Sequence, residues 1–547
     1  MPDMGEKIKR LSLELTRIAS VVGTRGEIKA VEYIYNYLKK VDYFIQNSRN
    51  LQLKDLKNDS LNRKYVMAFL EGKKASVNTV LLLGHIDTVG TDDYGDLKEY
   101  ATEPEILKQM LSKKSFDEEI TNDLKSDNWI FGRGIFDMKT GVASQMVMIE
   151  EFSEQLEKLQ GNLVFIGVPD EEGNSAGMLS AVQDLAELSK EKGWEFIAAI
   201  DTDYMTGQYT GDENKYVYIG TVGKLLPCFY VYGKETHVGE AFSGLDANLL
   251  ASELMKEVDL NYDLCDVAGG EATLPPISLH QRDLKTEYSV QTVNAVNLYF
   301  NFATHISQPD EVLEKLKQKA IMAFENTIRM LNENYRKYCE LSGTPYKRLP
   351  WRTRVFSFEE LYKNVKDEIG KEIDNKLETL TDELLKMGAD DREFSLRIVQ
   401  EVHKHYSDKN PVIIIYFAPP FYPHIFVEGA NQREAKLLNA VEQAVKEVRE
   451  KYEYKIIVKK FYPYISDLSY CSISKNEESI RKLVNNMPAW PKKYSLPVEA
   501  IQQISMPVLN IGPYGKDAHK LTERISQSYS LDAMPMILQK TIERLLS

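Results

Sequence analysis

Residues 79–87 read TVLLLGHID, a short apolar run that ends in a histidine and an aspartate. An apolar run of this length predicts a buried strand of an α/β sheet. Leu163–Val168 is a second such run before an acidic turn, and Phe196–Ile200 is a third before Asp201. Segments with helical spacing separate these runs, so strand, polar turn and helix alternate. This alternation predicts an α/β fold with a mainly parallel sheet and helices on its faces.

A different pattern begins near residue 208. Alternating β-rich segments and helical segments follow one another there, which is typical of a two-layer α+β domain. After Gly429 the α/β pattern returns, with a predicted strand at Val508–Gly512. We therefore expect a first domain made of residues 1–207 and 431–547, with residues 208–430 inserted into it as a second, α+β domain.

Three further expectations concern the remaining segments. Residues 91–128 are charged and weakly patterned, which predicts an exposed excursion from the first domain. Residues 340–410 are charged and helical, and we expect them to elaborate the inserted domain. The predicted strand Val412–Phe417 is expected to stop before Pro419 and Pro420, because prolines break the element.

The composition excludes several classes of protein. Of the 547 residues 43% are hydrophobic and 27% charged, and no apolar run approaches the roughly 20 residues of a membrane span. The net charge of -14 argues against a nucleic-acid partner, which would need a basic face. The amino terminus has no apolar signal core, and the four cysteines are far apart without a CxxC pair. We expect a cytoplasmic protein of at least two domains, without a membrane or nucleic-acid partner.

The segment 130–141 reads IFGRGIFDMKTG and places Asp137 between a glycine turn and a predicted helix. One carboxylate has two oxygens, so it can hold two divalent ions about 3.5–4 Å apart, as metal-assisted hydrolysis requires. A helix N-cap is the competing interpretation of Asp137. Metal-ligand candidates elsewhere in the chain favour the first interpretation.

Polar side chains follow the predicted strands at what should be one rim of the sheet, where open parallel sheets place their chemistry. They are His85, Glu171, Glu172, Asp201 and, after the last strand, His519. Imidazole and carboxylate are usual zinc ligands, and carboxylates this close would repel one another without cations. Taken singly, each residue has a structural alternative, such as a core histidine, a solvated turn or a helix cap. Together and in this order they favour a site for two zinc ions, with cobalt or manganese as alternative metals.

Five motifs carry a resemblance to a known family. They are His85-x-Asp87, Gly-Arg-Gly-x-x-Asp137-Met-Lys, Asp-Glu171-Glu172-Gly, Gly233-Lys-Glu-Thr-His237-x-Gly and His519-x-x-x-Glu523. With these motifs in order over essentially the whole chain, the sequence resembles the zinc-dependent aminoacylase and carboxypeptidase family. That family includes acetylornithine deacetylase and succinyl-diaminopimelate desuccinylase. The long insertion and the turn at residues 465–470 most resemble its arginine-utilisation, RocB-type branch.

The resemblance implies two zinc ions and assigns three ligands to each. The ligands of one ion are His85, Asp137 and Asp201, and those of the other are Asp137, Glu172 and His519. Asp203 competes with Asp201, which we prefer because it directly follows the predicted strand. The Asp137–Met138 peptide would be cis, as it is in family members.

The resemblance also implies catalytic roles. Glu171 would be the general base that takes a proton from the attacking water and delivers it to the leaving nitrogen. Asp87 would accept a hydrogen bond from the His85 ring and fix its tautomer. His237 in the lid would stabilise the oxyanion, in some relatives from the other subunit of a dimer. Relatives often carry a substrate-binding arginine where this chain reads Phe302-Ala-Thr-His305, which puts carboxylate recognition by that route in question.

Together these observations predict a cytoplasmic two-zinc amidohydrolase with an α/β catalytic domain and an inserted α+β lid. Its substrate would be a small N-acyl amino acid or a short peptide, linked by the branch resemblance to arginine catabolism. The lid domain is a candidate surface for a homodimer. The main alternative is a binding or regulatory protein that keeps the fold without catalysis. A second alternative, a two-metal phosphoesterase, should offer basic phosphate clamps near the site.

Overall fold

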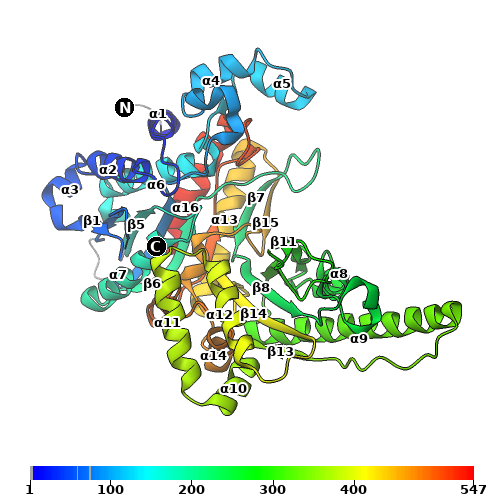
Figure 1. Cartoon of the computed structure of the whole chain (residues 1–547). Helices are drawn as coiled ribbons and strands as arrows, with labels where there is room; N and C mark the ends of the chain where they lie inside the picture. The colour runs from blue at the N-terminus through cyan, green and yellow to red at the C-terminus, as the bar shows by residue number, and fades with distance from the viewer. Residues whose placement is uncertain (1–3, 58, 73–75) are drawn as a thin grey trace. The chain divides into compact units, whose positions relative to one another are not determined.

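The computed structural model describes residues 4–57, 59–72 and 76–547, and the chain forms two compact units (Figure 1). The first unit comprises Met1–Val222, His424–Ile473 and Pro497–Ser547, and the second comprises Gly223–Pro423 and Ser474–Leu496. The first junction therefore lies at residue 222, whereas the sequence predicts 207. The physical reason is β7 (Lys215–Ile219), which pairs with strands of the first unit's sheet.

An eight-stranded mixed sheet forms the centre of the first unit, in the order β1-β2-β5-β3-β6-β16-β7-β15. Its other strands are β1 (Leu51–Asp55), β2 (Lys64–Leu70), β3 (Asn78–His85), β5 (Asn162–Val168), β6 (Glu195–Asp201), β15 (Ile456–Lys459) and β16 (Val508–Asn510). β3 runs parallel to both β5 and β6, and β16 runs parallel to β6. β2 and β7 run antiparallel to their neighbours β5 and β16. The predicted α/β class is confirmed, and β3, β5 and β6 direct their carboxyl ends to one edge.

Helices bury the apolar side chains of this sheet. α6 (Thr140–Ser153) is buried along most of its length and packs on β2, β3 and β5. α7 (Ala176–Lys192) packs on β2 and β5, and α13 (Gln432–Tyr452) packs on β6 and β15. Three more helices complete the packing, namely α1 (Met4–Thr16) on α6, α2 (Gly26–Leu38) on β2, and α16 (Met534–Leu545) on α13.

The excursion between β3 and α6 has a small core of its own, so the prediction of an exposed segment is wrong in part. It contains α4 (Pro104–Leu111), α5 (Glu118–Lys125) and the strand β4 (Trp129–Phe131). The core residues are Tyr94, Leu97, Ala101, Leu107, Leu111, Leu124 and Phe131. Each helix has only eight residues and two or three buried positions, which explains why the sequence pattern is weak.

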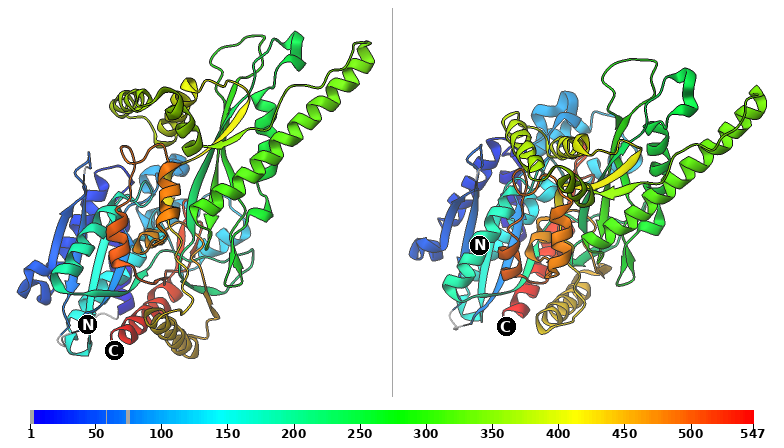
Figure 2. Two further views of the ribbon diagram at one scale, coloured as in Figure 1. Left: turned by 90° about the horizontal axis from the view of Figure 1, so that it is seen from below. Right: turned by 60° about the horizontal axis from the view of Figure 1, so that its bottom comes forward.

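A five-stranded sheet, in the order β11-β12-β8-β14-β13, forms the second unit with its helices. The strands are β8 (Gly223–Tyr232), β11 (Ile277–Asp283), β12 (Ala295–Thr304), β13 (Val355–Ser357) and β14 (Val412–Tyr422). α8 (Ala247–Val258) packs against the 34-residue α9 (Pro309–Ser342), whose far end projects beyond the sheet (Figure 2). The predicted helical elaboration contains α10 (Phe358–Ile369), α11 (Glu372–Lys386) and α12 (Asp391–His405), and α14 (Glu477–Asn485) also belongs to this unit.

β14 corrects the prediction that the prolines end the strand. The strand runs on to Tyr422, and the Pro419–Pro420 peptide is cis. Its pairing with β8 shifts register between Ala418 and Tyr422, so the prolines lie where the regular ladder of hydrogen bonds is interrupted. Among the described residues, no helix is both long and apolar enough to cross a membrane.

Candidate metal centre

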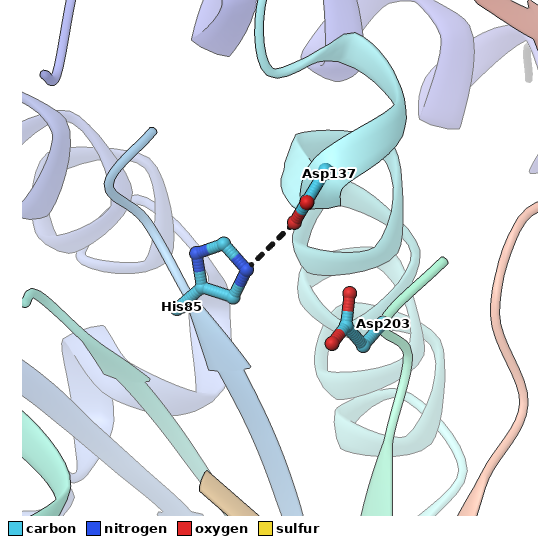
Figure 3. Close-up of side chains that lie close together, drawn as sticks. All are labelled: His85, Asp137 and Asp203. Carbon is cyan, nitrogen blue, oxygen red and sulfur yellow. Dashed lines mark hydrogen bonds and ion pairs between the residues drawn. The ribbon is translucent and has the colours of Figure 1, made fainter. Parts of the chain in front are cut away.

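Two overlapping groups of metal-ligand side chains lie at the carboxyl edge of the first unit's sheet. One group is His85, Asp137 and Asp203, and the other is Asp137, Glu172 and His519. Within each group the ligand atoms lie within 4.8 Å of one another. Figure 3 shows the first group, whose three side chains point toward one another from three separate elements. Asp137 belongs to both groups, as expected of a shared ligand.

The local structure around each strand end explains why these side chains meet. His85 is the last residue of β3, Asp203 follows the end of β6, and Glu172 lies in the turn after β5. Because these three strands are parallel, their ends share one edge of the sheet. His519 comes from the loop between β17 (Gly515–Lys516) and β18 (Arg524–Ser526), with a positive φ of 64°.

Asp137 is presented by the glycine turn that precedes α6. Gly134 has a φ of 79°, and a Cβ there would meet the Thr88 methyl group at 2.5 Å, so a side chain does not fit. The Asp137–Met138 peptide is cis, which confirms that prediction. Asp137 Oδ1 lies 2.9 Å from His85 Nε2, and Oδ2 lies 2.9 Å from His519 Nε2. Each oxygen of this carboxylate therefore faces a different histidine.

Asp203, rather than the preferred Asp201, completes the first group. Asp201 Oδ2 accepts a hydrogen bond from Ser466 Oγ at 2.8 Å, and Oδ1 accepts one from the Thr202 N–H at 2.7 Å. The Asp203 carboxylate is oriented by the Tyr204 N–H, which donates to Oδ1 at 2.7 Å. Both aspartates accept the N–H of the following residue, and only Asp201 also accepts a hydrogen bond from Ser466, which favours Asp203 as the candidate ligand.

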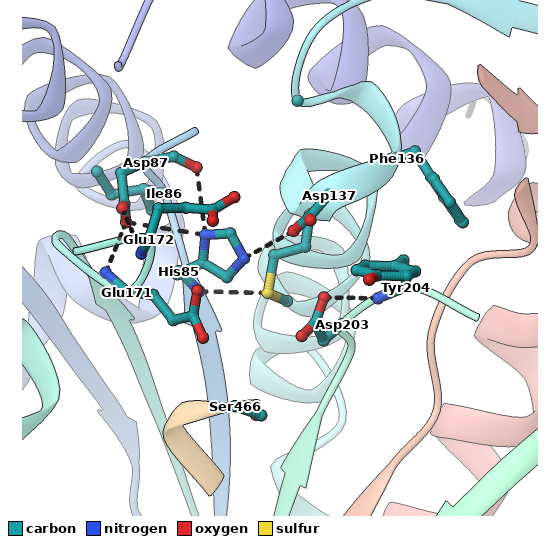
Figure 4. A network of polar contacts seen from close by, with 12 residues as sticks. His85, Ile86, Asp87, Phe136, Asp137, Glu171, Glu172, Asp203, Tyr204 and Ser466 are labelled. Atoms are coloured by element: carbon teal, nitrogen blue, oxygen red, sulfur yellow. Dashed lines mark hydrogen bonds and ion pairs between the residues drawn. The ribbon is translucent and has the colours of Figure 1, made fainter. Parts of the chain in front are cut away.

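Asp87 also differs from its expected role. Its carboxylate accepts the backbone N–H groups of Glu171 and Glu172 at 3.2 and 3.0 Å (Figure 4). The His85 Nδ1 atom lies 3.2 Å from the Asp87 carbonyl oxygen but 3.7 Å from its carboxylate. The backbone carbonyl, rather than the carboxylate, therefore orients the ring so that Nε2 faces Asp137. The Asp87 carboxylate instead holds the turn that carries Glu171 and Glu172.

The electrostatics of these side chains fit a cation-binding site. Burial raises the pKa of Asp203 well above its ordinary value, and the negative charges of Asp137 and Asp201 raise it further. Burial opposes protonation of His519, but hydrogen bonds and charge from Asp137 and Glu172 outweigh it and raise its pKa to about 10. Without a cation the carboxylates thus draw protons into the site. Divalent ions would displace those protons, and the nitrogen and oxygen donors suit zinc.

Glu171 belongs to neither ligand group, although it is adjacent to Glu172. Burial raises the pKa of its carboxyl group well above the ordinary value. The positive charge of His85 opposes this rise, and the negative charge of Glu172 adds to it. Glu171 thus lies outside both groups, in surroundings that favour its protonated form.

His237 lies in the second unit, where it caps the short helix Val238–Ser243. Its ring is exposed, and Nδ1 accepts a hydrogen bond from the Gly239 N–H at 3.1 Å. A neutral ring with an accepting Nδ1 carries its proton on Nε2, so Nε2 is the available donor. Its role toward an oxyanion remains a prediction.

Asparagine variants test which of the two aspartates at the end of β6, Asp201 or Asp203, binds a metal ion. Asp203→Asn is expected to lower the zinc content by about one ion per chain, because it replaces a charged ligand of the first group. Asp201→Asn is the matched control and should keep the zinc content of the parent, since its amide oxygen can accept the Thr202 N–H while its amide nitrogen donates to the Ser466 hydroxyl. Elemental analysis of both folded variants measures this difference. Loss of zinc from Asp201→Asn alone would restore Asp201 as the ligand.

Comparisons with known proteins agree with this geometry. The profile of Peptidase family M20/M25/M40 matches residues 81–544. The chain is 34% identical to Protein RocB of Bacillus subtilis (strain 168) over 543 residues, which cover 99% of this chain and 95% of RocB. It is also 34% identical over 547 residues to the uncharacterized protein YqjN of the same organism, covering 99% and 96% of the two chains. The crystal structure of aminopeptidase PepT from Bacillus cereus shares the fold, with a TM-score of 0.53 and 13% identity over 99% of each chain.

Proposed function

Because the chain belongs to peptidase family M20/M25/M40 and is a metal-dependent peptidase or amidohydrolase, we propose that it binds two zinc ions and hydrolyses a small substrate. The reaction would be hydrolysis of the amide or peptide bond of an N-acyl amino acid or a short peptide. The observation that carries this proposal is Asp137, whose two carboxylate oxygens each face a histidine of a different ligand group. Such a carboxylate is suited to hold two ions at once.

His85, Asp137 and Asp203 would hold one ion, and Asp137, Glu172 and His519 would hold the other. Two divalent ions in a site of this kind polarise a substrate carbonyl and make water more acidic. The protein supplies the fixed ligand geometry. Asp87 contributes to this geometry by accepting hydrogen bonds from the backbone of the Glu171–Glu172 turn. The fixed turn would present Glu172 to a metal ion and Glu171 to the substrate.

Glu171 would move the protons of the reaction. Its carboxylate would accept a proton from the attacking water and then donate it to the leaving nitrogen. Burial favours the protonated form between these two steps, which suits a group that must carry a proton briefly. The Nε2–H of His237 would donate a hydrogen bond to the oxyanion that forms on the carbonyl oxygen.

The proposal also covers the substrate class and the cellular compartment. Resemblance to the arginine-utilisation branch supports a link to arginine or amino-acid catabolism, and the identity to RocB over nearly the whole chain supports that branch. All four cysteines are free thiols, and three of them are buried, which supports a reducing compartment such as the cytoplasm.

A substrate screen of the zinc-loaded full chain tests the reaction class. N-acyl amino acids and dipeptides with cationic, anionic and apolar side chains are compared with phosphoesters, and release of a free amine is measured. We expect turnover of at least one amide and none of the phosphoesters. Phosphoester hydrolysis alone would contradict the proposal. A folded, zinc-loaded chain that binds an amino acid without cleaving any amide would favour the binding-protein alternative.

A further inference from the structure

Glu523 is a buried carboxylate that the proposed reaction does not use. It lies four residues after His519, and the residue is 0% exposed. Its Oε1 atom accepts the Gly134 N–H at 2.7 Å and, at longer range, the N–H groups of Phe136 and Asp137 at 3.3 and 3.4 Å. The loop that supplies one metal ligand thus sends a side chain into the turn that supplies the shared ligand.

The other oxygen of Glu523 is held by Arg133. Arg133 Nη1 donates to Oε2 at 2.6 Å, and Nη2 donates to both carboxylate oxygens of Asp93 at 2.8 Å. Arg133 is 1% exposed and also donates from Nε to the Gly90 carbonyl at 3.2 Å. With two carboxylate partners the guanidinium is paired, and it fixes Glu523 in one orientation.

The far end of the His519 loop is anchored by Arg524. This residue is 0% exposed, and its Nε donates to Asp123 Oδ2 at 2.8 Å, on helix α5. Its Nη1 donates to Asp517 Oδ2 at 2.5 Å and to the Thr522 carbonyl at 3.0 Å. Two neighbouring residues therefore anchor the loop: Arg524 binds Asp123 in the excursion, and Glu523 binds the Asp137 turn.

We propose that Glu523 is a positioning residue that fixes the Asp137 turn against the His519 loop and thereby keeps the ligands of both metal groups in register. The inference rests on the two-metal site of the proposed function. A stabilising ion pair alone would need only the contact with Arg133. The three N–H groups that converge on the other oxygen belong to the turn of the shared ligand, so loss of this carboxylate should move Asp137.

Variants of Glu523 test the inference through metal affinity. In Glu523→Gln an uncharged amide group would face Arg133. In Glu523→Asp the carboxylate keeps its charge, but the side chain is one methylene shorter, so the carboxylate lies farther from the turn. Zinc and cobalt affinities of the full chain are measured by competition with a chromophoric chelator, well below the melting temperature of each metal-free variant. We expect both variants to bind the ions about 10- to 100-fold more weakly than the parent.

Asp93→Asn is the matched control, because it removes the negative charge of the other carboxylate that Arg133 binds and leaves the Asp137 turn untouched. We expect a lower melting temperature with parental metal affinity. Parental affinity in both Glu523 variants, or an equal loss of affinity in Asp93→Asn, would overturn the positioning role. A parent that binds neither zinc nor cobalt would overturn the two-metal function as well, so the two failures are distinguishable.

Discussion

Replacing Glu171 with glutamine is expected to lower kcat by about 100- to 10,000-fold while the zinc content stays at that of the parent. Glutamine has nearly the same shape but cannot accept a proton from water or deliver one to the leaving nitrogen. Because Glu171 belongs to neither ligand group, the ions should remain bound. The measurement combines kcat at saturating substrate, for the best amide of the screen, with elemental analysis of the same sample.

Glu195→Gln is the control for this experiment. Glu195 begins β6 in the same sheet and is exposed, so its variant should keep both kcat and zinc. Retained turnover in Glu171→Gln would remove Glu171 as the base. Loss of zinc together with turnover would instead show that Glu171 helps to hold an ion.

Asparagine at position 137 should have the larger effect on metal content. Asp137 is the one residue that belongs to both ligand groups of the described chain, so Asp137→Asn weakens both sites at once. The amide loses the negative charge and one of the two oxygen ligands. We expect the zinc content to fall from about two ions per chain to well below one, with loss of turnover.

His519→Ala provides the comparison, because it removes a ligand from only the second group. About one ion per chain should remain in that variant. Equal zinc contents in Asp137→Asn and His519→Ala would argue against a shared ligand. Circular dichroism of the metal-free proteins shows whether each variant is folded.

The positions of most candidate ligands follow from the sequence, because a strand end is a local signal. The runs before His85 and Glu172 are short and apolar, and parallel strands bring their ends to one edge of a sheet. A different kind of information separates Asp201 from Asp203. Ser466, which donates to Asp201, is 265 positions away, so only the folded chain shows which of the two carboxylates this serine contacts.

The role of Glu523 is hidden for a related reason. The sequence shows it at a fixed spacing after His519, but its contacts lie 386 to 390 residues away, in the turn before α6. Asp87 is similar, because its carboxylate meets backbone N–H groups, which carry no signature of residue type. The excursion is a third case, since short helices that pack on one another produce little periodicity.

The order of the ligands along the chain has a consequence for biosynthesis. His85, Asp137, Glu172 and Asp203 are all made before the second unit begins at Gly223, whereas β16 and His519 are made after its last residue, Leu496. At about 5–20 residues per second, the ribosome needs on the order of tens of seconds to pass from Asp203 to His519. During that interval the nascent chain carries all the candidate ligands except His519, while β6 lacks its neighbour β16. The metal centre is therefore completed late in synthesis, at about the time when β16 can take its place between β6 and β7 in the sheet.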